Sequence, residues 1–275
     1  MMNAVVPALE SIASRLNGLG IWSTRHSVWG RTMGARTFDR SLYLWMHRGG
    51  LMGVSERRVL SELVHPGMCA VDVGANLGLY SLMMAALAGP AGRVLSFEPD
   101  PDLYALLVEN CAANGAGTVE AHHMALGETS SRMTLNRTTL NSGNNHLGGG
   151  GWTVLRSPVE VEVAALDQLA PDLRPDFIKV DVQGWELKVL RGMEGILRAS
   201  PKAVVYVEIW PEGLHRAGDS PEGLFAFFKA LGFRFYACSD RSELDEAGFT
   251  RLAGSINSLN HVDLLASRER PASRA

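Results

Sequence analysis

The part of the sequence that most constrains the fold begins at Cys69, where short apolar runs start to alternate with longer amphipathic stretches. Short apolar runs are typical of buried strands, and the stretches between them have helical spacing. We expect strands at Cys69–Val73, Val94–Phe97, Val119–Ala125, Phe177–Val182, Ala203–Ile209, Arg234–Cys238 and His261–Ala266, and helices at Leu77–Leu87, Pro101–Asn114, Trp185–Arg198 and Glu222–Leu231. Because helical crossovers join parallel strands, this alternation predicts an α/β fold with a doubly wound, mostly parallel sheet.

Two stretches of the chain depart from this alternation. Residues 1–66 have helical periodicity, several Trp and Gly residues and no strong strand, so we expect a helical segment or lid ahead of a main domain at 67–268. Residues 133–163 have two polar-apolar alternations around a loop rich in Asn and Gly. This pattern predicts an inserted hairpin or loop that orders when a ligand binds. The polar residues 269–275 are expected to form a flexible tail.

The composition argues against several classes of partner. With 26 basic and 29 acidic residues the net charge is -3, so the chain has no general positive field for nucleic acid or acidic membranes. The longest apolar run, Leu79–Ala88, is much shorter than the about 20 residues of a membrane span. Charged residues interrupt the periodic stretch near the N-terminus, which argues against a signal peptide. We therefore expect a cytoplasmic protein that binds neither nucleic acid nor a membrane, and a homo-oligomer is left open.

A glycine-containing turn, within the run "DVGANLG", follows the first expected strand. Ligands of open α/β sheets bind beyond the carboxyl ends of the strands, so this turn is a candidate site. Gly74 can take a positive φ and let the backbone approach a ligand closely, and Gly78 lets the next helix pack tightly. Asp72 lies inside the apolar strand, where a carboxylate needs hydrogen bonds or a cation.

An acid at the end of the second expected strand completes this pattern. Glu98 precedes Pro99 and comes about twenty residues after the glycine turn. A carboxylate at this position can accept hydrogen bonds from both hydroxyls of a ribose. A dinucleotide would require glycine at the position of Asn76, so that pyrophosphate can approach the helix N-terminus. The pattern therefore predicts a pocket for a nucleoside without phosphates and disfavours a nicotinamide-dependent oxidoreductase.

This combination resembles the nucleotide-binding half of class I S-adenosylmethionine-dependent methyltransferases. Four segments in order, "DVGANLGLYS", "FEPDPDLYALLVEN", "FIKVDVQGWELKVLRG" and "VEIWPE", narrow the resemblance to the FkbM family of methyltransferases, over about residues 69–238. That family transfers methyl groups mainly to hydroxyl oxygens of sugars, polyketide-type natural products and related metabolites. The resemblance implies a Rossmann-like methyltransferase domain with S-adenosyl-L-methionine as cofactor. The expected cofactor contacts are Asp72, Gly74, Asn76, Gly78, Glu98, Pro99, Ala125, Leu126 and Asp181.

Polar residues near the carboxyl ends of the later strands are candidates for the reaction itself. An alcohol oxygen needs its proton drawn away, and Asp181 is the first candidate for this base, with His146 and His215 as alternatives. Glu208 ends an apolar strand and contacts either a substrate hydroxyl or a neighbouring backbone group. A divalent metal held by Asp181, Glu208 and an amide such as Asn144 ranks second, because no closely spaced acid cluster indicates a dedicated site.

The candidate substrate contacts are Glu186, Asn144 and His215, and Glu186 can also orient the loop before its helix. Gln183 stands where the family pattern "DVEGxE" usually carries an acid, which leaves Asp181 with one fewer negative neighbour. The expected function is an S-adenosylmethionine-dependent O-methyltransferase that acts on a hydroxyl of a small metabolite or glycan. The alternative is a catalytically silent module that binds the cofactor and serves as a partner subunit.

Overall fold

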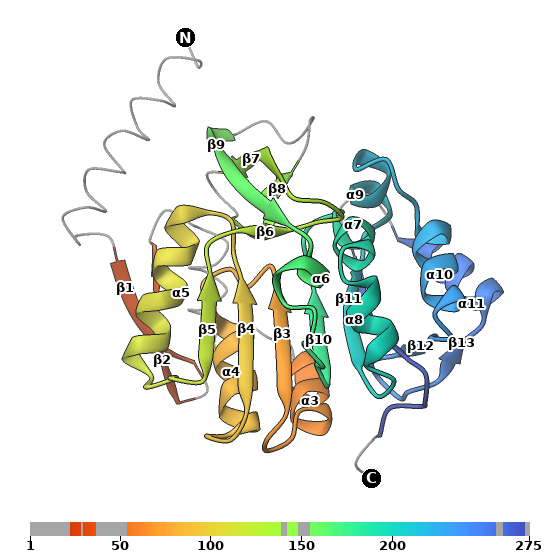
Figure 1. Cartoon of the computed structure of the whole chain (residues 1–275), viewed down its shortest axis with the longest axis horizontal. Helices are drawn as coiled ribbons and strands as arrows, with labels where there is room; N and C mark the ends of the chain where they lie inside the picture. Colours follow the sequence, from red (N-terminus) through yellow and green to blue (C-terminus); the bar gives the residue numbers. More distant parts are fainter. Residues whose placement is uncertain are drawn as a thin grey trace.

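The computed structural model describes residues 23–28, 30–36, 54–138, 142–147, 155–256 and 261–272. Its centre is an eight-stranded sheet in the order β13-β12-β14-β11-β10-β3-β4-β5 (Figure 1). The strands are β3 Cys69–Val73, β4 Arg93–Phe97, β5 Val119–His122, β10 Phe177–Val180, β11 Val204–Ile209, β12 Arg234–Ala237, β13 Glu243–Leu244 and β14 Val262–Ser267. Strands β5, β4, β3, β10 and β11 are parallel, and β14 runs antiparallel between β11 and β12. The predicted mostly parallel α/β sheet is confirmed.

Helices lie on both faces of this main sheet, with α4 behind it and α6 and α8 in front in the view of Figure 1. The helices are α3 Val54–Leu63, α4 Leu79–Ala88, α5 Pro101–Ala113, α6 Leu166–Leu169, α7 Glu186–Arg191, α8 Glu194–Ala199, α9 Pro211–Arg216, α10 Pro221–Ala230 and α11 Glu246–Ser255. No helix among the described residues has both the length and the apolar character needed to cross a bilayer.

The single helix expected at Trp185–Arg198 is two helices in the structure, α7 and α8. The break lies at Gly192, where an added Cβ would be 1.9 Å from the carbonyl oxygen of Gly127. The side chain of Asp167 accepts two backbone N–H groups at the start of α8, each at 2.8 Å. These tertiary contacts end the first helix, although the apolar spacing continues through the break.

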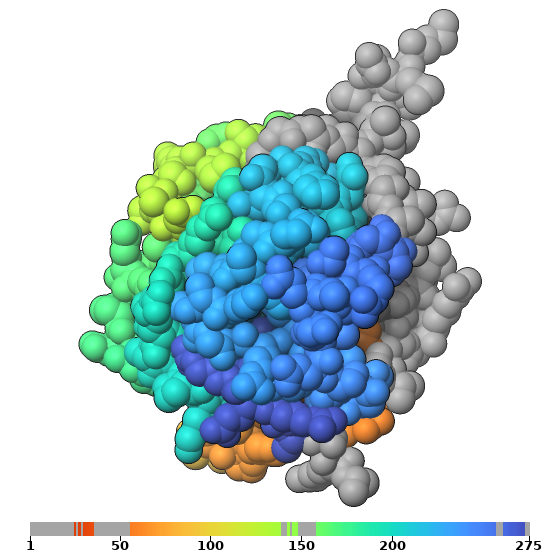
Figure 2. Space-filling view, turned by 90° about the vertical axis from the view of Figure 1, so that its right-hand side faces the viewer, coloured from red at the N-terminus to blue at the C-terminus, as the bar shows by residue number. Residues whose placement is uncertain are grey.

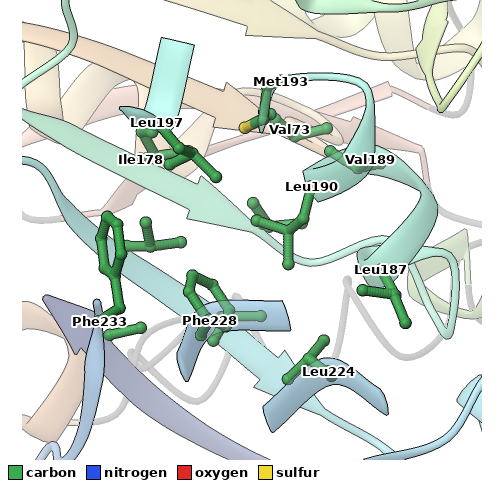
Figure 3. Close-up of a cluster of buried hydrophobic side chains, with 14 of the residues drawn as sticks. Val73, Ile178, Leu187, Val189, Leu190, Met193, Leu197, Leu224, Phe228 and Phe233 are labelled. Atoms are coloured by element: carbon green, nitrogen blue, oxygen red, sulfur yellow. The ribbon is translucent and has the colours of Figure 1, made fainter. Parts of the chain in front are cut away.

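Each face of the main sheet packs against its own set of helices. On one face the strands meet α7, α8 and α10, and Figure 3 shows Ile178, Leu190, Leu197 and Phe228 in this core. On the other face, residues such as Ala70 meet side chains of α3, α4 and α5. Because successive side chains of a strand alternate between the faces, strands buried on both sides are apolar along their length. This is why their positions were predictable.

A second, four-stranded sheet lies beyond the ends toward which β3, β4 and β10 point (Figure 1). It consists of β6 Ala125–Leu126, β7 Ser131–Thr138, β8 His146–Leu147 and β9 Leu155–Ala164, in the order β6-β9-β7-β8. Strands β7 and β9 pair antiparallel, so the predicted hairpin is present. The run of glycines at 148–151, expected to order on ligand binding, lies outside the described residues. We call this second sheet the insertion sheet.

The N-terminal part of the chain differs from the expectation of a purely helical segment. Strands β1 Ser23–Val28 and β2 Arg31–Arg36 form an antiparallel hairpin, and α3 follows it. The described part of the expected helical segment therefore contains a strand hairpin as well as a helix. Residues 1–22 and 37–53 of the same segment lie outside the described residues.

The hairpin binds to α5 through two amide side chains, which explains why its own sequence did not predict it. The N–H of Gly34 donates to Oδ1 of Asn110 at 2.6 Å, and Nδ2 of Asn114 donates to the carbonyl oxygen of Thr32 at 2.7 Å. The two amides lie one helical turn apart and take the place of a neighbouring strand. The signal for β2 therefore lies about 80 residues away, in the sequence of α5.

The C-terminal end of the chain completes the main sheet. Figure 2 shows that its segments, drawn in blue, form much of the surface on this side of the molecule. Helix α11 and strand β13 were not expected from the sequence. Asp245 caps α11 by accepting the N–H of Gly248 at 2.7 Å, so an acidic N-cap was the available signal.

Candidate functional site

A pocket lies where the carboxyl ends of β3, β4 and β10 face the insertion sheet. It holds about 660 Å³ of empty space, counted with its open mouth. The expected site residues that line it are Gly74, Asn76, Glu98, Pro99, Ala125, Leu126, His146 and Asp181. Residues expected from three separate parts of the chain therefore meet in one place.

The turn after β3 brings the backbone of the neighbouring strand very close. Gly74 has a φ of +78°, and an added Cβ would lie 2.0 Å from the carbonyl oxygen of Asp181. The expected positive φ is confirmed, and a backbone carbonyl is the group that approaches the glycine. Asn76 has a φ of +52°, and its side-chain oxygen accepts the N–H of Leu77 at 2.8 Å. Glycine and a local hydrogen bond together shape this turn.

Gly78 lies at the N-cap of α4 and does not line the pocket. Its φ is +91°, and an added Cβ would lie 2.6 Å from Cδ1 of Leu107 in α5. The expected tight packing of the helix is present, and the expected contact with a cofactor stays a prediction.

Glu98 lies at the end of β4, beside the glycine turn. Its carboxylate oxygens accept the backbone N–H groups of Asn76 and Asp100, each at 2.8 Å. Burial raises the pKa of Glu98 to about 8, against the lowering effect of these two N–H groups. Each oxygen keeps a lone pair, so the carboxylate can accept further hydroxyl groups while the backbone holds it.

Asp72 does not line the pocket, contrary to the expectation that it contacts a cofactor. It is completely buried on the α4 face of the main sheet, between Lys179 and Ser96 on the neighbouring strands. One of its oxygens lies 3.5 Å from Nζ of Lys179, and the other accepts the hydroxyl of Ser81 at 2.6 Å. The carboxylate therefore has both kinds of partner that burial requires, and they come from the protein itself.

Lys179 is a central residue of this site that the sequence analysis missed. Its buried ammonium group lies 3.5 Å from Asp72 and 3.3 Å from Asp181, and it donates to the carbonyl oxygen of Gly74 at 3.2 Å. The ring centroid of Tyr80 lies 4.8 Å from Nζ. Burial lowers the pKa of Lys179, but the two carboxylates outweigh burial and hold the pKa above its ordinary value. Lys179 therefore stays charged between the buried acid and the pocket acid.

The side chain of Gln183 joins two acids at the carboxyl ends of β10 and β11. Its amide donates to Oδ1 of Asp181 at 3.1 Å and to the oxygens of Glu208 at 3.0 and 3.2 Å. Asp181 lines the pocket with its side chain 34% exposed, whereas Glu208 is 3% exposed and does not line it. Burial, with the charges of Asp181 and Glu186, raises the pKa of Glu208 well above its ordinary value. Glu208 therefore contacts the pocket residue Gln183, and its catalytic role stays a prediction.

Glu186 is completely buried at the start of α7 and does not line the pocket. One oxygen accepts the N–H groups of Val182 and Gly184 at 3.1 and 2.9 Å. Burial raises the pKa of Glu186 to about 7, against the lowering effect of its backbone N–H donors. Glu186 therefore hydrogen-bonds to the loop that precedes its helix, and a role in substrate contact stays a prediction.

The insertion sheet supplies a further wall of the pocket. His146, on β8, is 2% exposed and lines the pocket together with Asn145. His215 has an exposed side chain on α9 and is not part of the lining. The backbone of Asn144 belongs to a 3₁₀ turn at Ser142–Asn144, but its side chain lies outside the described part of the structure. The structure therefore brings one of the two candidate histidines to the pocket.

The other walls of the pocket are largely apolar. They include Val73, Phe97, Leu103, Ala125, Leu126, Leu135, Leu147, Val182 and Trp185. The indole Nε1 of Trp185 is buried and has no acceptor among the described residues. The described lining contains no Lys or Arg, and its acids are Glu98 and Asp181. Such a lining suits an uncharged or cationic nucleoside better than a phosphate.

Within the described ranges, no group of three or more His, Cys, Asp or Glu side chains is placed to hold a metal ion. The amide nitrogen of Gln183 bridges Asp181 and Glu208, the two acids considered for a metal. An amide nitrogen is a hydrogen-bond donor, whereas a divalent cation needs oxygen ligands there. The described residues do not support the metal-assisted alternative.

A family model described as "Methyltransferase FkbM domain" matches residues 72–235. The chain belongs to this family. The matched range contains the glycine turn, Glu98 and the segment from Asp181 to Gln183, so it covers the residues that build the pocket on the main sheet. The resemblance to the FkbM family seen in the sequence is confirmed.

Relatives of this FkbM chain match over about half of its length. Hexuronic acid methyltransferase AglP of Haloferax volcanii is 27% identical and matches over 54% of this chain and 60% of its own length. Methyltransferase sdnD of Sordaria araneosa is 31% identical, over 52% of this chain and 67% of its own. A crystal structure of a methyltransferase FkbM from Methylobacillus flagellatus aligns with 72% of this chain and 43% of that chain, with 17% identity and a TM-score of 0.44. The chain therefore spans less than two thirds of the length of AglP.

Proposed function

We propose that this FkbM family member is an S-adenosyl-L-methionine-dependent O-methyltransferase that acts on a hydroxyl of a small metabolite or glycan. The observation that carries the proposal is the make-up of the pocket. Glu98 is held by two backbone N–H groups with lone pairs to spare, and the described lining has no cation for a phosphate. This is what a nucleoside cofactor without phosphates requires.

The residues present fit this cofactor. Glu98 would accept the ribose hydroxyls, since its position after β4 is the one where acids bind ribose in such sheets. Apolar side chains of Leu103, Ala125 and Leu126 would contact the base. The negative charge of Asp181 favours a ligand that carries a positive charge.

When bound, the cofactor supplies a methyl group already activated by its attachment to a sulfonium. The protein then has to orient the acceptor oxygen, exclude water and take up the hydroxyl proton. Asp181 is our first candidate for the last task, because its carboxylate is exposed to the pocket and oriented by Gln183 and Lys179. His146 is the second, because it lines the same pocket and a neutral imidazole nitrogen can accept a proton.

Support for a hydroxylated acceptor comes from the family and from the relative named as a hexuronic acid methyltransferase. The pocket also offers groups that can bond to hydroxyls, namely the carboxylate of Asp181 and the amide of Gln183. The proposal includes a small-molecule or saccharide acceptor, no nucleic-acid partner and a cytoplasmic location.

Isothermal titration calorimetry with S-adenosylmethionine and S-adenosylhomocysteine, followed by an assay of S-adenosylhomocysteine release, tests this function. We expect both compounds to bind, and release to require a hydroxylated acceptor from a panel of sugars and polyketide alcohols. Binding without release across the panel would favour a silent cofactor-binding module. Binding of NAD(H) in place of either compound would refute the proposal.

A further inference from the structure

Asp100 lies next to the pocket residue Glu98 and does not itself line the pocket. Asp100 is the N-cap of α5, and its Oδ1 accepts the backbone N–H groups of Asp102 and Leu103 at 2.8 and 3.3 Å. Its own N–H donates to Oε1 of Glu98 at 2.8 Å. Asp100 therefore helps to hold the acid that would bind the ribose.

The same carboxylate accepts hydrogen bonds from the insertion sheet. Arg137, near the end of β7, donates through Nε to Oδ2 at 2.7 Å and through Nη2 to Oδ1 at 3.1 Å. Nδ2 of Asn145 donates to Oδ2 at 2.9 Å. Arg137 also pairs with the carboxylate of Asp102. The side chains of Arg137 and Asp100 are 9% and 1% exposed, so the network is largely shielded from water.

Asn145 connects this network to the pocket wall. Its Oδ1 accepts the N–H of Thr138 at 2.8 Å, which ties the segment 142–147 to the end of β7. The next residue, His146, pairs with Asn136 of β7 and lines the pocket. The wall at 142–147 is therefore attached to the start of α5 through contacts that meet mainly at the Asp100 carboxylate.

We propose that Asp100, Arg137 and Asn145 form a clamp that positions the 142–147 wall against the cofactor side of the pocket. Arg137 is a positioning residue in this clamp, because it is not part of the pocket lining and acts through the wall that it holds. The consequence for ligand affinity rests on the proposed function, whereas the attachment of the wall does not.

A buried charge pair is costly to break, because removal of one partner leaves the other buried without its counter-charge. Loss of the Arg137 guanidinium should therefore separate the wall from α5 and admit water. A pair on the surface of the same strand should have no such effect. Arg132 and Glu162 are such a pair, 3.6 Å apart with side chains 76% and 63% exposed, so Arg132→Met is a matched control.

Hydrogen–deuterium exchange of the full chain without ligand tests the attachment. In Arg137→Met we expect exchange in residues 131–138 and 142–147 to rise by about tenfold or more, with β3, β4 and β10 unchanged. Arg132→Met should match the wild type. Arg137→Lys should restore part of the protection, because lysine keeps the positive charge but cannot make the paired hydrogen bonds of the guanidinium. Equal exchange in Arg137→Met and Arg132→Met would overturn the clamp, and so would a rise spread evenly over the whole chain.

Calorimetry with S-adenosylhomocysteine tests the positioning role. Arg137→Met should weaken binding by about tenfold, and the loss on combining it with Asp100→Asn should be smaller than the product of the two single losses. If exchange rises in the wall while affinity stays at the wild-type value, the wall is attached by the clamp but not positioned for the ligand, and the proposal fails. If the wild type itself does not bind the compound, the proposed function fails, and the exchange experiment still decides on the clamp.

Discussion

The two halves of the pocket edge on the main sheet are held by different kinds of group. At the ends of β3 and β4, the backbone holds Glu98 through two N–H groups, and Gly74 meets a backbone carbonyl. At the ends of β10 and β11, side chains hold the pocket acid instead, since Lys179 and Gln183 both contact the carboxylate of Asp181. The backbone-held half depends on the path of the chain. The side-chain-held half depends on a balance of charges, so single substitutions can change its chemistry while the fold persists.

The largest effect is expected from removing the cation of the side-chain-held half. Lys179→Met leaves Asp72 completely buried without its ammonium partner, which should cost about 3–5 kcal/mol of unfolding free energy. Urea denaturation measures this loss. The double variant Lys179→Met/Asp72→Asn should recover much of it, because the buried charge is then gone. A loss below about 1 kcal/mol in the single variant would show that Lys179 is not needed for charge balance.

In the backbone-held half, Gly74→Ala is expected to cost about 2–4 kcal/mol, from the positive φ and from the clash with the carbonyl of Asp181. Gly67→Ala is the matched control, because Gly67 has a φ of +85° and no atom within 4 Å of an added Cβ. It should cost about 1 kcal/mol. Equal losses of stability in the two variants would mean that the close approach of β10 contributes nothing.

Glu98→Gln sharpens the comparison through the pH dependence of ligand binding. Burial raises the pKa of Glu98 to about 8, so the carboxylate that would accept hydrogen bonds from the ribose hydroxyls forms only as the pH rises toward that value. In the wild type, binding of S-adenosylhomocysteine should strengthen by about 100-fold between pH 6 and pH 9. In Glu98→Gln the pH dependence that remains belongs to the ligand and to other groups. Identical calorimetric profiles for both proteins would contradict ionisation of Glu98 as the cause.

The smallest effect is expected from Glu208→Gln, measured as stability against pH. Because burial raises the pKa of Glu208, the folded state keeps a proton that the unfolded state releases above about pH 4.3. The wild type should therefore lose stability relative to the variant as the pH rises from 5 to 8, by at least about 1 kcal/mol. Thermal denaturation at both pH values measures the difference. A stability difference between wild type and variant that stays constant over this range would show that Glu208 is ionised in the folded protein.

The sequence predicted the parts of the molecule whose signals are local. The central strands β3, β4, β10 and β11 were predictable because both of their faces are buried, and the position of Glu98 beside the glycine turn because it depends on one strand end and one turn. The contacts of Lys179 were not predictable, because they depend on which strands become neighbours across the sheet. Arg137 was missed for the same reason, since its partner Asp100 lies 37 residues earlier on another element.

Two expected cofactor contacts, Asp72 and Gly78, illustrate a second limit. The sequence shows that Asp72 needs a partner but not on which face of the sheet the partner lies, and the cross-strand register places it toward Lys179 and α4. Gly78 is needed for the packing of α4 on Leu107, a contact that a turn motif alone cannot distinguish from contact with a ligand. In both cases the requirement was predictable and the group that meets it was not.

The central claim is that Glu98 binds the ribose of an S-adenosyl nucleoside while Asp181 serves the transfer of the methyl group. Calorimetric binding of S-adenosylhomocysteine to the wild type, Glu98→Ala and Asp181→Ala at pH 8.5 tests it most directly. We predict that Glu98→Ala loses binding by about 100-fold or more, the loss expected for strong hydrogen bonds to a charged group, and that Asp181→Ala stays within about threefold of the wild type. Wild-type affinity in Glu98→Ala would contradict the account.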